Sequence, residues 1–255
     1  MRVSKLIPTS VLRRIDRFRE GRILAVTAPA AREYIGKYGL EVRHGPFTGM
    51  SYLDGLESSV GDLVAKLTGV YERELHGAVD EWLHTGFDHV IDVGSAEGYY
   101  AVGFAHAMPN TTVHAYDIDP VARDRTSRLA ALNGVAERVV TGGECAPSTL
   151  ADFPERGVAL LSDCEGYERT LLDPGAAPRL RGWTILVELH DFIDPTISET
   201  ILGRFRATHE IEVIEMEDRR DVPSELDFAT PGQLSKLLSE RPPGMRWAHM
   251  RPRGG

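Results

Sequence analysis

One stretch, residues 90–100, constrains the fold of this chain more than any other. An apolar run, residues 90–93, leads into a glycine-containing turn and then directly into residues 99–108, which have helical character. Glycine permits tight turns and close backbone approach to a ligand. A helix that begins right after the turn offers free N–H groups and the positive end of its dipole. The stretch therefore predicts a strand, a tight turn and a helix whose start faces a ligand.

The turn has the wrong glycine spacing for a dinucleotide. Its glycines are spaced G-x-x-x-G, and an acid, Asp92, stands two residues before the first. Dinucleotide folds use G-x-G-x-x-G around a pyrophosphate. A carboxylate this close to the turn would repel a pyrophosphate, but it suits a ligand that carries an ammonium group. The spacing resembles motif I of the class I methyltransferases, which bind S-adenosylmethionine (SAM). The residues that this resemblance places at the cofactor are Asp92, Gly94, Ser95, Ala96, Glu97, Gly98 and Tyr99.

The next strand ends in another acid. Residues 112–116 form an apolar strand that is followed by Asp117. In Rossmann-like folds a carboxylate about 20 residues after the glycine turn holds ribose hydroxyls. Pro120 then opens a helix over residues 121–133, because proline suits a first helical turn. Two acids at the tips of adjacent strands predict a nucleoside-type ligand, with Asp117 on its ribose.

Two later strands, residues 158–162 and 185–189, are also followed by polar side chains. Ligands bind at the carboxyl edge of open α/β sheets, so these side chains are expected to converge near the cofactor. They are Asp163, Glu188, His190 and Asp191. Histidine titrates near neutral pH, which makes His190 the candidate general base for a hydroxyl acceptor. Asp163 or Glu188 would hold its ring or orient the hydroxyl.

Two motifs around these acids make the resemblance more specific. They are Asp-x-Glu-Gly-x-Glu at residues 163–168 and Val-Glu-Leu-His at 187–190. Together they resemble the FkbM-type methyltransferases, over about residues 88–195. The resemblance implies O-methylation of natural products or glycans. Residues 116–120 read Tyr-Asp-Ile-Asp-Pro where the family usually has aromatic-Glu-Pro, but the acid at the ribose position is kept.

The loop after the third strand adds two further cofactor contacts. In this superfamily that loop borders the adenine, which implies that Glu144 or Cys145 faces it. A plain loop without cofactor contact remains the alternative for these two residues.

The order of patterns predicts the fold class. From residue 87 onward strand-like and helical segments alternate, which is typical of a parallel sheet covered by helices. We expect a Rossmann-like α/β fold with a seven-stranded, mostly parallel sheet and helices on both faces. The last two strands enclose a helix-like stretch and form a hairpin-like return. The expected strands are residues 90–93, 113–116, 139–141, 158–162, 185–189, 210–216 and 246–250, and the helix-like stretch is 231–240.

Residues 1–85 differ from this pattern and are expected to form an N-terminal helical segment, ahead of a SAM-binding methyltransferase domain over residues 86–255. Residues 60–84 are largely helical in pattern and end just before the glycine turn. They form either a packing helix or a lid that excludes water from the cofactor. If they form a lid, deletion of residues 1–55 would leave a soluble core that still binds SAM.

Composition limits the partners and the compartment. The net charge of −9 argues against a general nucleic-acid binder. The basic residues 11–22 could pack against the acidic remainder of the chain, or they could contact a membrane surface or a partner. No signal peptide or apolar run of membrane-spanning length is visible. Cys145 and Cys164 suggest neither a disulfide framework nor a zinc site, so a reducing cytoplasm is expected.

Several alternatives stay open on the sequence alone. One is a nicotinamide-dependent oxidoreductase, which the glycine spacing disfavours, and another is a SAM-binding protein without catalysis. An acid cluster can also hold Mg²⁺, for which Asp163, Glu188 and Asp191 are candidates. The need for a metal is left undecided, as are the identity of the small-molecule or glycan acceptor and the oligomeric state, a homo-oligomer included.

Overall fold

A single mixed sheet forms the centre of the molecule. The computed structural model describes residues 27–53, 60–216, 222–238 and 245–254, and the basic residues 11–22 lie outside these ranges. The described strands pair in the order β3-β2-β1-β4-β5-β7-β6. All pairs are parallel except those of β7, which runs antiparallel to both neighbours. The strands are β1 (His89–Val93), β2 (Thr112–Tyr116), β3 (Val139–Gly142), β4 (Val158–Ser162), β5 (Thr184–Leu189), β6 (His209–Glu215) and β7 (Arg246–Pro252).

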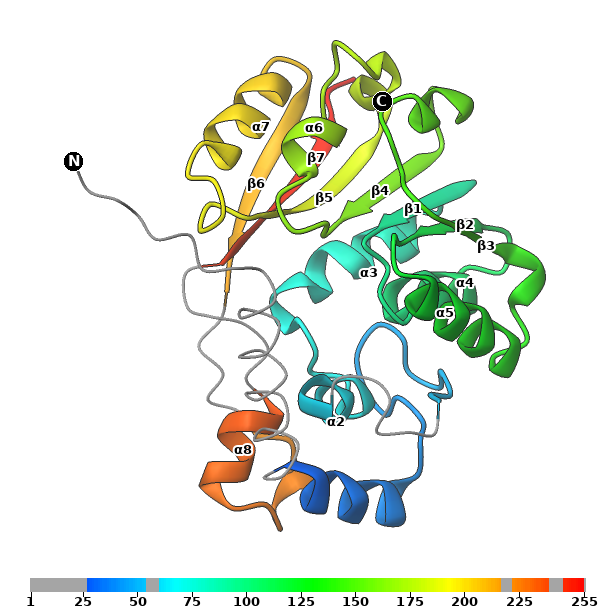
Figure 1. Ribbon diagram of the computed structural model, residues 1–255, viewed down its shortest axis with the longest axis vertical. Coiled ribbons are helices and arrows are strands. Elements are labelled where there is room, and N and C mark those ends of the chain that lie inside the picture. Colours follow the sequence, from blue (N-terminus) through cyan, green and yellow to red (C-terminus); the bar gives the residue numbers. More distant parts are fainter. Residues whose placement is uncertain (1–26, 54–59, 217–221, 239–244, 255) are drawn as a thin grey trace.

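Helices bury both faces of this sheet (Figure 1). Because side chains alternate along a strand, Val90 of β1 packs into one hydrophobic cluster and Ile91 into the other. The first face is covered by α3 (His76–Thr85), α4 (Tyr99–Ala107) and α5 (Pro120–Leu132), and the second by α6 (Glu168–Leu171) and α7 (Ile197–Phe205). Strands that are covered twice read as continuous apolar runs, which is why they stand out in the sequence.

The predicted fold class is confirmed. All seven expected strands are present within two residues of their expected bounds, and the last pair is antiparallel. The helical pattern over residues 60–84 is interrupted, giving α2 (Val60–Thr68), the 3-10 turn η1 (Arg73–Leu75) and α3. Gly69 causes the break, because its φ is 73° and a Cβ there would lie 1.9 Å from the carbonyl oxygen of His44.

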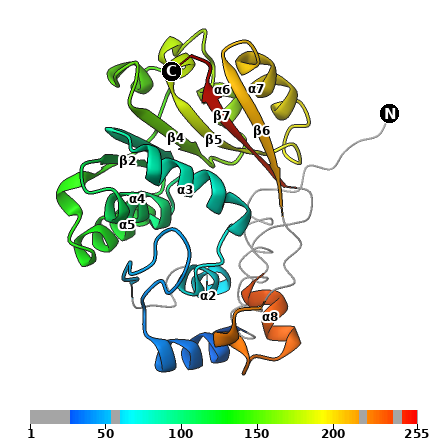
Figure 2. The ribbon, with the colours of Figure 1, turned by 180° about the vertical axis from the view of Figure 1, so that it is seen from behind.

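Segments that precede the sheet in the sequence, together with one segment between β6 and β7, form a helical cap. We define this cap as residues 27–53, 60–75 and 222–238. Residues 27–38 are helical, and α8 (Pro231–Leu237) packs against α2. Both views show these helices grouped beside the sheet (Figures 1 and 2). A hydrogen bond of 2.7 Å between His44 Nε2 and Glu225 Oε1 also joins the two segments. The cap therefore has a C-terminal part that the sequence analysis did not assign to it.

The cap shares its core with the sheet. Tyr34, Phe47 and Met50 are fully buried in the hydrophobic cluster that also contains the apolar side of α4. Phe47 meets the rings of Tyr99 and Phe104 edge to face, at centroid distances of 5.4 and 5.3 Å. The shared cluster argues against the expectation that a chain without residues 1–55 stays a soluble core, which remains a prediction. That deletion would expose the cluster, because the partners of these side chains lie in distant elements.

The contact between Phe47 and α4 gives a stability prediction. A Cβ at Gly103 would lie 2.5 to 2.7 Å from three ring carbons of Phe47. We expect Gly103→Ala to lower the free energy of unfolding by about 1–3 kcal/mol through overpacking, although alanine favours a helix interior. Gly77→Ala in α3 is the matched control, because it meets no atom within 4 Å and should stabilise by up to about 1 kcal/mol. Urea unfolding of both variants checks the pair, and equal effects would contradict the packing argument.

Candidate functional site

The glycine turn after β1 adopts conformations that few residues tolerate. The φ angles of Gly94, Ala96 and Gly98 are 86°, 47° and 92°. At Gly94 a Cβ would lie only 1.8 Å from the backbone oxygen of Asp163, so only glycine fits there. The Ala96 N–H donates to Oδ2 of Asp117 at 2.9 Å, which ties the turn to the end of β2. The turn therefore brings the carboxyl ends of β1, β2 and β4 together.

A cavity of about 620 Å³ opens at these strand ends. Its size lies within the usual range of small-molecule sites. Asp117 lies at the cavity and uses one lone pair on each carboxylate oxygen for the N–H groups of Ala96 and Asp119. The lining residues are Val93, Gly94, Ala96, Tyr116, Asp117, Ile118, Gly143, Glu144, Cys145, Asp163, Cys164, Glu165 and Tyr167.

A smaller hollow of about 50 Å³ adjoins this cavity, and Gly94, Ala96 and Asp163 line both. Oδ2 of Asp92 and Oγ of Ser95 are buried there and have no hydrogen-bond partner among the described residues. Burial, followed by the charge of Asp163, raises the pKa of Asp92 to about 8. A positively charged group in this hollow would relieve both effects. The hollow is therefore suited to a small cationic group.

A buried ion pair closes the hollow on the cap side. Nζ of Lys66, from α2, lies 2.5 Å from Oε1 of Glu97 in the glycine turn, and Tyr52 donates to the same oxygen at 2.7 Å. Burial alone would raise the pKa of Glu97, but Lys66 outweighs burial and lowers that pKa to about 2. The pair is therefore ionised at neutral pH, and the stability it contributes is lost only as the pH falls from the ordinary glutamate range toward 2.

Aromatic rings surround this ion pair. The ammonium of Lys66 lies 4.5 Å from the ring centre of Tyr71 and 5.7 Å from that of Tyr99. The next tyrosine, Tyr100, donates a hydrogen bond of 2.5 Å to Oε2 of the buried Glu72. Rings of this kind attract a cation and exclude water from it. The cap thus supplies charged and aromatic groups directly beside the glycine turn.

A second cluster lies at the ends of β4 and β5, around the buried ring of His190. Nε2 lies 3.3 Å from Glu188 Oε2, 3.5 Å from Asp163 Oδ1 and 3.6 Å from Glu165 Oε2. Nδ1 lies 2.9 Å from Oε1 of the fully buried Glu168. Burial lowers the pKa of His190, but the contact with Glu168 and the surrounding carboxylates outweigh burial and raise it. Four carboxylates therefore stand around one imidazole.

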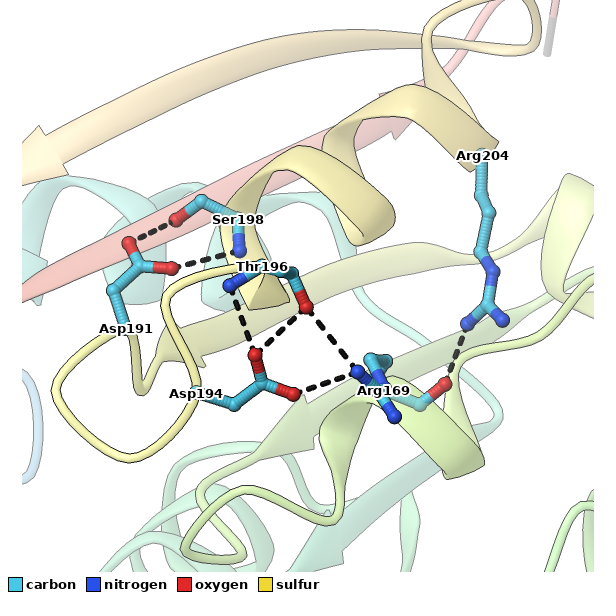
Figure 3. Close-up of polar contacts among 6 residues, drawn as sticks. All are labelled: Arg169, Asp191, Asp194, Thr196, Ser198 and Arg204. Atoms are coloured by element: carbon cyan, nitrogen blue, oxygen red, sulfur yellow. Dashed lines mark hydrogen bonds and ion pairs between the residues drawn. The ribbon is translucent and has the colours of Figure 1, made fainter. Parts of the chain in front are cut away.

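Asp191 does not join this cluster, contrary to expectation. Its Oδ1 accepts the N–H of Ser198 at 2.9 Å, and its Oδ2 accepts from Ser198 Oγ at 2.5 Å (Figure 3). Oδ2 also accepts a hydrogen bond of 2.7 Å from Nη2 of Arg246. Asp194 makes a similar set of bonds with Thr196 and Arg169 in the same loop (Figure 3). Both acids hold the start of α7, so Asp191 is unavailable to the Mg²⁺ site for which it was a candidate.

Most other predicted residues lie where the sequence placed them. Every predicted cofactor residue except Gly98 lines the cavity or the hollow. Gly98 is the N-cap of α4 and lies against Thr126. Lys66 and Trp247 line the hollow and were missed. Lys66 could have been noticed in the sequence because it is a charged residue within the apolar run of α2. No local feature of the sequence distinguishes Trp247.

Comparisons with known proteins support the fold at low sequence identity. No protein-family model matches the chain, and no curated protein does. An rRNA methylase from Streptococcus thermophilus is 14% identical with a TM-score of 0.50, covering 71% of this chain and 96% of that chain. The C-terminal domain of precorrin-6Y C5,15-methyltransferase from Rhodobacter capsulatus is 16% identical with a TM-score of 0.42, covering 66% and 82%. The first of these shows a shared Rossmann-like α/β fold, and a fold does not by itself fix an activity.

The ion pair between cap and glycine turn gives the second prediction. Lys66→Met leaves the carboxylate of Glu97 buried without its cation, and breaking a buried pair in this way costs about 3–5 kcal/mol. We expect a loss of that size in the free energy of unfolding, measured by urea titration. The double variant Lys66→Met/Glu97→Gln should lose less, because no charge is left behind.

Lys37→Met is the matched control for this test. Lys37 is an exposed lysine of the same N-terminal region, so its replacement should change stability by no more than about 0.5 kcal/mol. If Lys66→Met is as stable as Lys37→Met, the ion pair does not hold the cap to the turn.

Proposed function

We propose that this chain is a SAM-dependent O-methyltransferase that acts on a hydroxyl of a small-molecule natural product or a glycan-like acceptor. One observation carries the proposal: a nucleoside-sized cavity with Asp117 at its edge joins an acid-lined hollow at Asp163. SAM is a nucleoside joined to an amino acid through a positively charged sulfur. The cavity would take its nucleoside, and the acids of the small hollow would attract its positive charge.

The chain's own residues fit this cofactor. A carboxylate has about four lone-pair sites, so Asp117 can accept ribose hydroxyls while it keeps its two backbone N–H partners. Glu144 and Cys145 also line the cavity and would border the adenine. Burial raises the pKa of Cys145 to about 12, so its thiol presents a neutral surface. The orphaned Oδ2 of Asp92 would receive the ammonium group.

The alternatives fit these features less well. A nicotinamide dinucleotide would place its pyrophosphate at the glycine turn, beside the charged Asp163, and these two negative groups would repel one another. A SAM-binding protein without catalysis would have no use for the buried polar cluster around His190. The FkbM-type motifs at residues 163–168 and 187–190 favour a hydroxyl acceptor. They are the basis for preferring O-methylation over methyl transfer to rRNA or to carbon.

When bound, SAM supplies a methyl group that an acceptor oxygen takes in one displacement, with the electron pair of the broken carbon–sulfur bond returning to sulfur. Asp163 lines both spaces, whereas the ring of His190 is 1% exposed. This favours Asp163 as the carboxylate that meets the acceptor hydroxyl and receives its proton. His190 and Glu188 would act from behind it as positioning residues, instead of His190 taking the proton directly.

The remaining expectations extend this proposal. The cap would serve as the lid, since Lys66 and Tyr71 line the hollow and lids exclude water from transfer sites. Among the described helices, none combines the length and apolar character needed to cross a membrane. Cys145 and Cys164 are both free thiols, which supports a reducing cytoplasm as the location. We expect neither nucleic acid nor a membrane as partner, and a homo-oligomer is compatible with the proposal.

The cofactor assignment is tested by calorimetry with SAM, S-adenosylhomocysteine and NAD(P). We expect the first two to bind and NAD(P) not to bind. Hydrogen bonds to a charged group contribute roughly 1.5–3 kcal/mol, so Asp117→Ala should weaken SAM binding by at least about tenfold.

Asp119→Ala is the control for the cofactor test. Asp119 is a neighbouring acid that caps α5 and does not line the cavity, so its loss should affect stability but not SAM affinity. Binding of NAD(P) in place of SAM would overturn the cofactor, and a folded Asp117→Ala protein with unchanged affinity would remove the ribose assignment.

The role of His190 is tested by methyl transfer from labelled SAM to a panel of hydroxylated acceptors. We expect His190→Ala to lower kcat by about 10²-fold, because misplacing a reacting group such as Asp163 by about 1 Å can cost that much, and to change the KM for SAM little. Added imidazole should restore part of the rate if the ring acts by positioning Asp163. Near-normal turnover of a folded His190→Ala protein would exclude a role for this residue in transfer.

A further inference from the structure

We propose that Asp163, Glu165 and His190 form a binding site for one divalent transition-metal ion at the rim of the cofactor cavity. Asp163 and Glu165 follow β4, and His190 follows β5, so the sheet edge brings all three together. One ligand atom from each residue lies within 4.8 Å of the other two. Glu165 has no other role in the proposed methyl transfer.

The distances fit an ion better than direct hydrogen bonds. Nε2 of His190 is 3.5 Å from Asp163 Oδ1 and 3.6 Å from Glu165 Oε2. Both exceed the usual upper limit of about 3.2 Å for an N–H···O bond. Ligand atoms at about 2.1 Å from one metal ion are separated by about 3.0 Å at octahedral angles and about 3.4 Å at tetrahedral angles. Small side-chain adjustments would therefore complete the site.

The far side of the imidazole faces a carboxyl group, as that of metal-binding histidines usually does. Nδ1 lies 2.9 Å from Oε1 of Glu168, which accepts the N–H of Cys164 at 2.7 Å. Nδ1 and Oε1 are close but not aligned as a hydrogen bond, so a small rotation of the ring would be needed to form one. Glu168 is fully buried, so its carboxylate is fixed in place. A carboxylate on one ring nitrogen sets the tautomer and leaves the other nitrogen to bind the metal. Nε2 is thereby directed at Asp163 and Glu165.

The crowding of carboxyl groups and the backbone strain point to the same occupant. Glu188 adds a fourth carboxyl group, with Oε2 3.3 Å from Nε2, so four carboxyl groups meet around one imidazole. Glu165 also has a φ of 54°, in the left-handed region that non-glycine residues seldom adopt. Such strain is often found at ligand-binding positions. A divalent cation among these groups would explain why Glu165 is held in this conformation.

The donor set indicates the class of metal. Two carboxylates and one imidazole suit Mn²⁺, Fe²⁺ or Zn²⁺, whereas Mg²⁺ and Ca²⁺ prefer oxygen ligands alone. Glu165 is 78% exposed and lines the cavity, so an ion can enter from that side. The remaining positions of the ion would face the cavity. Its part in catalysis rests on the proposed methyl transfer: an ion there would bind the acceptor oxygen and lower the pKa of its hydroxyl.

Metal binding is tested on the full chain without SAM or acceptor, after chelator treatment. Calorimetric titration with MnCl₂ or ZnCl₂ should give one site per chain, with MgCl₂ at least about tenfold weaker. Pulsed electron paramagnetic resonance of the Mn²⁺ complex should show coupling to one imidazole nitrogen, and that coupling should disappear in His190→Gln. Absence of a one-to-one site for both Mn²⁺ and Zn²⁺ would overturn the proposal.

Variants separate this site from nonspecific binding. Glu165→Gln is the main variant because its exposed side chain can change without loss of the fold, and it should weaken Mn²⁺ binding at least tenfold. Glu168→Gln should weaken binding about 10- to 100-fold through the orientation of His190. Asp191→Asn is the matched control, because Asp191 is the adjacent acid and is bonded to Ser198 and Arg246 instead.

Thermal melting of each variant shows that it is folded. Equal Mn²⁺ affinity in Glu165→Gln and Asp191→Asn would also overturn the proposal. SAM calorimetry on the metal-free protein is scored separately, so a failed metal site and a failed cofactor assignment give different results.

Discussion

The close approach of Gly94 to Asp163 is the contact on which the site depends. The backbone oxygen of Asp163 occupies the place that a side chain at Gly94 would need, and the Asp163 N–H donates to Val93 at 2.9 Å. These contacts hold the turn after β1 against the turn after β4. Because Asp163 lines both spaces, this one backbone arrangement joins the nucleoside-sized cavity, the acid-lined hollow and the histidine cluster.

The fold and much of the candidate site could be predicted because their causes are local. Strands β1, β4 and β5 are covered on both faces, so each reads as a short apolar run. Parallel strands end at one edge of the sheet, which places Asp92, Asp117 and Asp163 near one another once the strands are recognised. The glycine turn is also a local requirement of the backbone.

The remaining features depend on partners that are distant in the sequence. Asp191 is adjacent to His190, yet it bonds to Arg246 on β7, 55 residues further on. Trp82 donates its indole N–H to His249 at 3.0 Å across 167 residues, which fixes α3 on the sheet. No local pattern reports such pairings. The packing of the cap could not be predicted for the same reason. The sequence of residues 27–53 does not indicate that their apolar side chains pack with those of α4 and α8.

The composition of the cap has a consequence for synthesis on the ribosome. Tyr34 and Leu67 share their cluster with Leu226 and Leu237, so the first half of the cap emerges long before the second. Domains tend to fold as their residues become available, and β1 to β5 can pair while residues 222–238 are still being made. The cap is therefore completed only after the strands β1 to β5 have been made. Until then its early apolar side chains remain exposed, which is the period in which a nascent chain of this design most needs a chaperone.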